Sequence, residues 1–217
     1  GMITHILDSL HQKTAINIIT MHHEQAAAFA AEGYARVTGL PGIALATSGP
    51  GATNLLTGIG SCYFDSTPAI FITGQVNRHE LKGDRGIRQL GFQETDIVSM
   101  ARPITKACFH ISDPDSIPKV FEEAFKIALE GRPGPVLIDI PMDVQRIQIE
   151  PEHFQSEKPE HLAIDSVVLE NLIKDIKQAK RPLVLAGRGI KASNQYGLNS
   201  YDAEVNGSPP KACATLT

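Results

Sequence analysis

The 217-residue sequence has few cysteines, no long apolar run and no block of positive charge. Its three cysteines, Cys62, Cys108 and Cys213, show no C-x-x-C spacing, which argues against both a disulfide framework and a zinc site. No stretch approaches the roughly 20 apolar residues that span a bilayer, and no secretory signal pattern opens the chain. These absences predict a cytoplasmic protein that is neither secreted nor embedded in a membrane.

The charges are balanced and dispersed along the chain. There are 20 Lys and Arg residues against 24 Asp and Glu, a net charge of −4, with no basic cluster to bind nucleic acid. With 42% hydrophobic and 20% charged residues, the composition is that of a globular protein with one sizeable core. Small acidic metabolites stay as candidate partners, whereas nucleic acid does not.

Short apolar runs alternate with helical patterns over about the first 144 residues. The runs are near-continuous, as in strands buried on both faces of a parallel sheet, and lie at 15–20, 42–46, 69–73 and 136–140. Helices are predicted at about 3–12, 23–38, 52–64, 94–101 and 114–130. The alternation predicts an α/β fold, a doubly wound parallel sheet with right-handed crossovers.

The last third of the chain is organised differently. Residues 165–180 predict a capped helix and 182–186 a strand, which together would start a second, truncated α/β domain. Residues 146–164, with two prolines and many charges, predict the linker to it. Residues 192–217 are polar and rich in turn formers, and are predicted to be a disordered tail.

The stretch MHHEQAAAFAAEGYARVTG, residues 21–39, opens a helical pattern with two histidines and Glu24. A zinc-protease helix needs H-E-x-x-H, but Ala27 stands where the second histidine is required. The zinc hypothesis is therefore excluded. Glu24 is either a first-turn acid favoured by the helix dipole or a residue with a chemical role.

Two loops also carry candidate functions. The stretch ATSGPGATN, residues 46–54, is a glycine-rich turn at the carboxyl end of a predicted strand, where doubly wound sheets bind ligands. It matches neither the dinucleotide nor the P-loop pattern, and the alternative is a simple tight turn. The long basic stretch at 75–92 is either a binding loop or a solvated excursion.

Five blocks in this order resemble the N-terminal, pyrimidine-binding domain of thiamine diphosphate enzymes of the acetolactate synthase type. The blocks are HHEQAAAFAAEGYARVTG, LATSGPGATN, ITGQV, FQETDIV and GRPGPVLIDIPMDVQ. The resemblance covers residues 2–145 and implies that family's flavodoxin-like fold. Residues 165–191 resemble the opening of the family's central domain.

The resemblance implies roles for individual residues. Glu24 is expected to hydrogen-bond N1′ of the aminopyrimidine of thiamine diphosphate and to favour the tautomer that removes the proton from the thiazolium C2. Burial against the alanine-rich helix is expected to raise the pKa of Glu24. Phe92 and Gln93 are expected on the substrate side, and Gln75 at the strand end. The loop near the pyrimidine ring is expected to consist of Thr47, Gly49, Pro50, Gly51 and Asn54.

The sequence also departs from the family pattern. Met142 replaces the usual lysine after the last strand, and the loop before FQE is longer and more basic, both where substrate selectivity would be set. The G-D-G motif and asparagine pair that hold the diphosphate and Mg²⁺ are missing, so no metal site is expected in this chain. A flavin site is expected only in full-length relatives.

Three functional hypotheses stay open. The chain is the pyrimidine half of a 2-oxo acid carboligase or decarboxylase, inactive alone; or a non-catalytic module that dimerises through residues 23–38; or one chain of a two-chain enzyme. The alanines Ala26–Ala28 would allow close packing against a partner helix. The expected assembly is a homodimer or a higher homo-oligomer, as in the family whose active sites lie between subunits, although a solitary homodimer would count against the two-chain hypothesis.

Overall fold

The computed structural model describes residues 1–12, 16–149, 165–183, 185, 187 and 189. The chain divides into two units, Gly1–Glu157 and Lys158–Thr217, and each is described here by itself. Three predicted segments lie wholly or partly outside the described residues: the disordered tail, most of the linker, and residues 184 and 186 of the strand predicted at 182–186.

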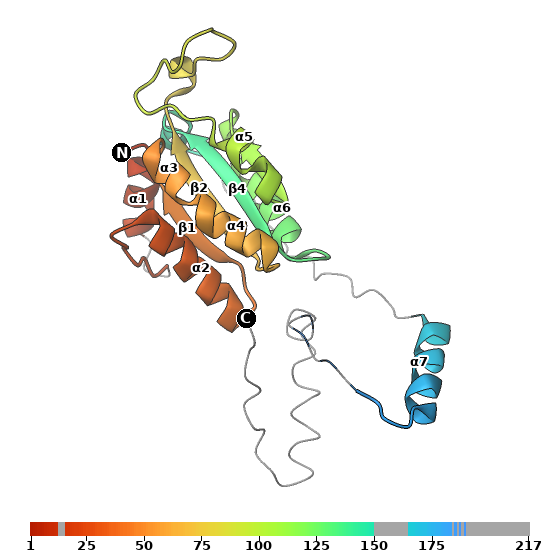
Figure 1. Ribbon diagram of the computed structural model, residues 1–217. Helices are drawn as coiled ribbons and strands as arrows, with labels where there is room; N and C mark the ends of the chain where they lie inside the picture. Colours follow the sequence, from red (N-terminus) through yellow and green to blue (C-terminus); the bar gives the residue numbers. More distant parts are fainter. Residues whose placement is uncertain (13–15, 150–164, 184, 186, 188, 190–217) are drawn as a thin grey trace. The chain divides into compact units, whose positions relative to one another are not determined.

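The first unit is built on a four-stranded, all-parallel sheet in the order β1-β2-β4-β3 (Figure 1). The fold is therefore α/β, as the alternation of apolar runs predicts. The central strands β2 and β4 are buried along their whole length, which explains their continuous apolar sequences. The strands are β1 (Gly42–Ala46), β2 (Ala69–Gln75), β3 (Ala107–His110) and β4 (Pro135–Pro141).

Helices cover both faces of this sheet, as a doubly wound fold requires. Because side chains alternate along a strand, Phe71 and Leu137 face one core with α2, α3, α4 and α5, while Ile70 and Ile138 face a second core with α6. Ile6 of α1 packs against the second core. The helices are α1 (Thr4–His11), α2 (Glu24–Thr38), α3 (Pro50–Asn54), α4 (Leu56–Phe64), α5 (Ile97–Ala101) and α6 (Ile117–Leu129).

Short 3-10 turns complete the first unit. They are η1 (Arg78–Glu80), η2 (Arg102–Ile104), η3 (Pro114–Ser116) and η4 (Val144–Arg146). Asp113 caps η3, where its carboxylate accepts from the Asp115 N–H at 3.2 Å. The longer helix α6 follows directly.

Small residues let α2 lie close to its neighbours. A Cβ on Gly42 of β1 would lie 1.9 Å from the carbonyl oxygen of Ala31, and one on Gly58 of α4 would lie 2.3 Å from Cβ of Ala28. The alanine-rich sequence of α2 is therefore used first inside the chain: Ala28 packs against α4, whereas Ala26 stays exposed. Gly39 ends α2 in the left-handed conformation, with φ of 76°.

Two sequence predictions need correction. The run at 15–20 forms no strand in its described part, residues 16–20, and Ile16, Ile18 and Ile19 are exposed. An apolar run becomes a strand only where its backbone finds a neighbour, and β1 is the last strand on that side of the described sheet. The single helix predicted at 52–64 is instead two helices, interrupted at Leu55.

The strand predicted at residues 182–186 is described only at 182, 183 and 185, and these three residues lie in no strand. The second unit does contain the predicted helix, α7 (Ser166–Gln178), which Asp165 caps by accepting from the Val167 N–H at 2.9 Å. Conversely, the edge strand β3 was not predicted, because its three half-buried residues and one exposed residue form no long apolar run.

Candidate functional site

The turn after β1, the start of α2 and the segment before α5 meet at the carboxyl ends of the strands. This is the edge where doubly wound sheets bind ligands. The residues that meet there were predicted from three separate blocks of sequence. Contacts between them show how the site is assembled.

Glu24 is the first residue of α2 and its carboxylate is held by the turn after β1. The Asn54 side-chain amide at the end of α3 donates to Oε2 of Glu24 at 3.1 Å. His23 caps the helix, since its Nδ1 accepts from the Gln25 N–H at 3.1 Å. The helix start thereby fixes where the Glu24 carboxylate points.

Gly51 and Thr47 form the floor below this carboxylate. A Cβ on Gly51 would lie 2.8 Å from Cγ2 of Thr47 and 3.2 Å from Oε1 of Glu24, so only glycine lets the turn approach so closely. The Thr47 hydroxyl accepts from the Met2 N–H at 2.8 Å. Pro50 occupies the first helical position of α3, where its missing N–H costs nothing.

Position 49 requires glycine for two separate reasons. Its φ of 63° lies in the left-handed region that disfavours side chains, and a Cβ there would lie 2.7 Å from Cβ of Gln93. The turn after β1 and the segment before α5 therefore touch at Gly49 and Gln93. Gln93 itself has φ of 61°, and the neighbouring Phe92 is 74% exposed.

The electrostatic prediction for Glu24 is wrong in sign. The hydrogen bond from Asn54 lowers the pKa of Glu24 below its ordinary value, helped by the backbone and by nearby His23, and outweighs the opposing effect of burial. Glu24 is only partly buried in this chain. The sequence shows that alanines surround Glu24, but it does not show how much water reaches the carboxylate, and the effect of burial on the pKa depends on that water.

One buried polar atom beside the site lacks a partner. Ser48 is 1% exposed, and its hydroxyl oxygen makes no hydrogen bond to any described residue. It lies between Thr47 and Gly49 in the turn that holds Glu24. An unpaired buried hydroxyl costs free energy unless a ligand or water satisfies it, so the turn fits a polar ligand.

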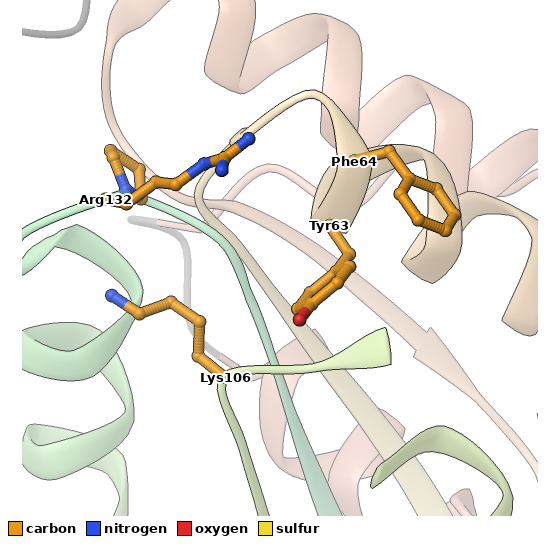
Figure 2. A pocket seen from close by; sticks show the side chains of 5 residues that line it. Tyr63, Phe64, Lys106 and Arg132 are labelled. Atoms are coloured by element: carbon orange, nitrogen blue, oxygen red, sulfur yellow. The ribbon is translucent and has the colours of Figure 1, made fainter. Parts of the chain in front are cut away.

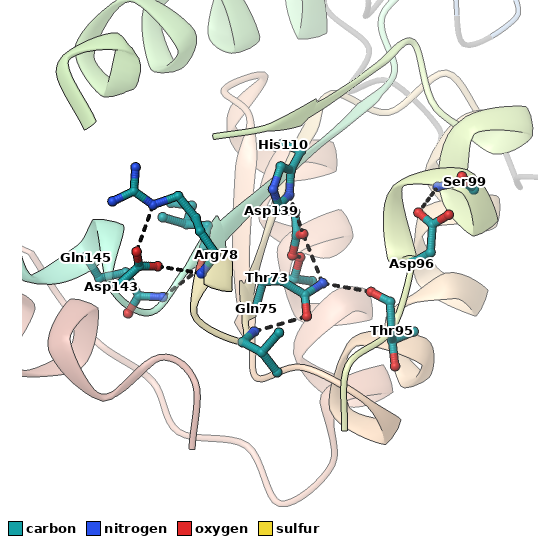
Figure 3. A network of polar contacts seen from close by, with 12 residues as sticks. Thr73, Gln75, Arg78, Thr95, Asp96, Ser99, His110, Asp139, Asp143 and Gln145 are labelled. Atoms are coloured by element: carbon teal, nitrogen blue, oxygen red, sulfur yellow. Dashed lines mark hydrogen bonds and ion pairs between the residues drawn. The ribbon is translucent and has the colours of Figure 1, made fainter. Parts of the chain in front are cut away.

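A buried network that the sequence did not predict joins three strands beside the site (Figure 3). Asp139 of β4, 1% exposed, accepts from the hydroxyl of Thr73 at 2.7 Å and from the amide of Gln75 at 3.2 Å, both in β2. His110, at the end of β3, contacts the same carboxylate through Nδ1 at 3.0 Å. The Gln75 amide also donates to the carbonyl of Thr95 at 2.7 Å.

The predicted basic loop is a folded lobe of residues 76–91, called the 76–91 lobe below. A Cβ on Gly91 would lie 2.8 Å from Val76, so the two ends of the lobe touch. Two carboxylates fold it: Glu80 accepts from Asn77, and Glu94 accepts from the N–H groups of Lys82 at 2.7 Å and Leu90 at 2.8 Å. The lobe is thus an ordered Ω-loop.

Arg78 anchors the 76–91 lobe to the sheet. Its guanidinium pairs with Asp143 after β4 at 2.7 Å and donates to the Ser112 carbonyl after β3 at 2.8 Å. Burial opposes ionisation of Asp143, but the hydrogen bonds from Arg78 prevail and lower the pKa of this carboxyl. The lobe therefore starts from a fixed point at the carboxyl ends of the strands.

The domain family "Thiamine pyrophosphate enzyme, N-terminal TPP binding domain" matches residues 1–100. This match covers 100 of the 217 residues. The resemblance predicted from the five sequence blocks is confirmed, as is the α/β fold with a parallel sheet that it implies.

Acetolactate synthases are similar over nearly the whole chain. Acetolactate synthase 2, chloroplastic, from Nicotiana tabacum is 40% identical over 201 residues, which are 90% of this chain and 29% of the relative. The acetolactate synthase large subunit of Corynebacterium glutamicum is 40% identical over 219 residues, 96% of this chain and 33% of the relative. The probable large subunit of Methanocaldococcus jannaschii is 41% identical over 198 residues, 88% and 32% respectively.

The chain thus spans about a third of the length of these relatives. Within the matched region, the structure brings together Glu24, Thr47, Gly51 and Asn54, and it brings Gln93 against Gly49. Among the described residues, no three His, Cys, Asp or Glu side chains are placed to hold a metal ion. In the same residues, no helix is long and apolar enough to cross a membrane.

A separate hollow of about 330 Å³ lies near the amino ends of β3 and β4 (Figure 2). Its cations are engaged elsewhere: the Lys106 ammonium donates to the carbonyls of Ile127 and Glu130, and Nε of Arg132 donates to the Ser66 hydroxyl at 2.6 Å. Burial lowers the pKa of Lys106. The hollow is lined by Tyr63, Phe64, Lys106, Arg132 and Pro133.

Proposed function

We propose that this chain supplies the pyrimidine-binding side of a thiamine diphosphate-dependent enzyme that acts on 2-oxo acids. The observation that carries the proposal is the Glu24 carboxylate, held by Asn54 above the glycine-rich turn at the carboxyl end of β1. The match to the thiamine pyrophosphate-binding family supports it. The three similar proteins are named as acetolactate synthases, which supports the reaction class.

The residues fit the cofactor's pyrimidine. Gly49 and Gly51 leave room where side chains would stand, and the unpaired Ser48 hydroxyl can meet a polar group. Bound thiamine diphosphate supplies the carbanion chemistry that a 2-oxo acid needs to lose CO₂. Glu24 would hold a proton at the pyrimidine N1′, and Asn54 would keep its carboxylate in place.

The lowered pKa of Glu24 suits the start of this role. A carboxylate that is ionised at neutral pH can accept a hydrogen bond from a protonated ring nitrogen, and it needs no prior loss of a proton. Desolvation by the bound ring would then raise the pKa of Glu24 toward that of its partner, which eases sharing of the proton.

The substrate side is assigned to Phe92 and Gln93. Phe92 offers an exposed aromatic ring, and Gln93 lies against the turn that carries Gly49. Met142, whose N–H donates to the Gln75 carbonyl at 3.0 Å, follows β4 at the same edge. A methionine cannot pair with a carboxylate as a lysine can, so the preferred 2-oxo acid would be held by other groups.

Calorimetric titration with thiamine diphosphate and Mg²⁺ tests the proposal. The wild-type chain should bind weakly but detectably, because the motifs that hold the diphosphate and Mg²⁺ are missing from it. Glu24→Gln should weaken this binding about tenfold, as expected for loss of one charge-assisted hydrogen bond. Glu122→Gln on the exposed surface of α6 removes the same charge and should change nothing. Equal binding by wild type and Glu24→Gln would contradict the role of Glu24.

We also propose that the chain forms a homodimer through the outer face of α2. Six small or apolar residues on this face are exposed at helical spacing: Ala26, Phe29, Ala30, Gly33, Tyr34 and Val37. No described residue covers them, although the inward face of the same helix is fully packed. A second copy is the simplest occupant, since a C2 axis brings one apolar helix face against its own copy.

A further inference from the structure

The network of Figure 3 ends at the segment that carries the proposed substrate-side residues. The Gln75 amide nitrogen is shared between two acceptors, the Thr95 carbonyl at 2.7 Å and Oδ2 of Asp139 at 3.2 Å. The other end of this amide is fixed, because its oxygen accepts from the Val76 N–H at 3.0 Å. Gln75 therefore links a buried carboxylate to the segment before α5.

Thr95 is joined in turn to Gln93. The Thr95 hydroxyl donates to the Gln93 carbonyl at 3.4 Å, and Gln93 is one of two non-glycine residues with positive φ in the described chain. A left-handed glutamine is strained and persists only when its surroundings fix it. The contact with Gly49 on one side and the hydrogen bonds of Thr95 on the other are those surroundings.

His110 is the member of the network that reaches solvent. Its side chain is 29% exposed, whereas Asp139, Thr73 and Gln75 are buried. Because the Asp139 carboxylate can only accept, Nδ1 of His110 is the donor to Oδ2, the same oxygen that Gln75 approaches. His110 and Gln75 thus satisfy one oxygen together, and Thr73 satisfies the other alone.

We propose that His110 is a positioning residue for the turn that carries Phe92 and Gln93. When His110 donates a hydrogen bond to Asp139, this carboxylate depends little on the hydrogen bond from Gln75. The Gln75 amide therefore keeps its short hydrogen bond to the Thr95 carbonyl. Without His110, Oδ2 of the buried carboxylate draws the Gln75 amide closer, because an underpaired buried charge is costly. The two hydrogens of the Gln75 NH2 group serve the two acceptors separately, so the bond to the Thr95 carbonyl lengthens as the nitrogen moves, and the Gln93 turn relaxes.

The catalytic meaning of this link rests on the proposed function, since only there are Phe92 and Gln93 assigned to substrate. The link itself is measurable in the chain without cofactor. If the link between His110 and the Gln93 turn is disproved, the proposed role of Glu24 is unaffected. If thiamine diphosphate does not bind, the link between His110 and the Gln93 turn is unaffected.

Nuclear magnetic resonance of His110→Leu, His110→Asn and Thr73→Val tests the proposal. His110→Leu should shift the carbonyl-carbon signal of Thr95 and the amide signal of Gln93, and should speed amide exchange there about tenfold, the effect of losing one hydrogen bond. His110→Asn should restore wild-type values, because its amide nitrogen can stand where Nδ1 stands. Thr73→Val removes the donor to the other oxygen and should leave the Thr95 signal in place.

Two results would overturn the proposal. One is a His110→Leu protein with reduced thermal stability but unchanged Thr95 and Gln93 signals, which would make His110 a structural residue of the β3 edge. The other is an equal shift in Thr73→Val, which would show that any loss from Asp139 disturbs the turn. If His110→Leu does not fold, His110→Asn alone decides the matter. Thr95 and Gln93 signals in His110→Asn that differ from the wild type would then overturn the proposal.

Discussion

Asn54 sets the ionisation of Glu24, and this can be tested without any ligand. Its amide lowers the pKa of the Glu24 carboxyl, so Asn54→Ala should raise that pKa toward the ordinary value. Because the folded-state pKa is lowered, ionised Glu24 adds stability above its unfolded-state pKa, and this stability is lost as pH falls through the folded pKa. Carbon-13 titration of the Glu24 carboxyl measures the shift.

The variant Thr53→Ala is the matched control for Asn54. Thr53 lies beside Asn54 in α3, and its hydroxyl donates to the Pro50 carbonyl at 3.1 Å, away from Glu24. Thr53→Ala should leave the pKa of the Glu24 carboxyl unchanged from the wild type. A shift of the same size in both variants would mean that α3 as a whole, and no single amide, controls the carboxylate.

The backbone of the turn is as specific as its side chains. Gly49→Ala forces a side chain into a left-handed residue and against Gln93, and should reduce the free energy of unfolding by about 1–3 kcal/mol. Gly86→Ala is the control, since a Cβ there meets nothing within 4 Å and the residue is not left-handed, so alanine should stabilise the protein by up to about 1 kcal/mol. Urea unfolding of both proteins provides the comparison; equal stability of Gly49→Ala and wild type would refute the strain argument.

Sequence reasoning located the residues of the site better than their energetics. Glu24, Thr47, Gly51 and Asn54 come from two blocks that a parallel α/β fold brings to one sheet edge, so their contact follows from pattern and fold. The pKa of Glu24 does not follow, because it depends on one amide and on the water left around the carboxylate. Asp139 was missed because it lies among the apolar residues of β4, and His110 was missed because its strand, β3, has no long apolar run.

At the scale of elements, the central strands were the easiest to predict and the edges the hardest. Strands β2 and β4 are buried along their length, and burial imposes a continuous apolar sequence that is visible without a structure. At the edges a strand needs a neighbouring strand to pair with as well as an apolar sequence. The run at 16–20 has an apolar sequence but no paired strand among the described residues, whereas β3 pairs with β4 but has no long apolar run.

The 76–91 lobe is held by carboxylates, and this predicts its resistance to protease. Glu94→Ala removes the acceptor of the Lys82 and Leu90 N–H groups, so the lobe should open and trypsin should cleave after Arg85 or Arg88 at least about tenfold faster. Glu123→Ala on the exposed face of α6 is the control and should leave the rate unchanged. Mass spectrometry of the fragments identifies the cleaved bond; rapid cleavage of the wild-type lobe would show that it is not ordered by Glu94.

At the scale of the whole molecule, helices α2 and α7 each present several apolar residues to water. On α2 these are the outer-face residues named above, of which Phe29 is 43%, Tyr34 52% and Val37 79% exposed. In the second unit, α7 exposes Val168 at 60% and Leu172 at 54%. Either surface could drive self-association, because apolar area gains free energy when it leaves water.

The outer face of α2 is the better candidate because of its small residues. Ala26, Ala30 and Gly33 let two helices approach closely, and larger side chains flank them. We therefore expect Phe29→Glu to convert a dimer into a monomer, since two buried carboxylates would face each other across the two-fold axis. Val168→Glu places the same charge on α7 and should leave the dimer intact. Sedimentation velocity over a range of concentrations separates the cases: a monomeric Val168→Glu beside a dimeric Phe29→Glu would place the interface on the second unit, and a monomeric wild type would contradict the dimer itself.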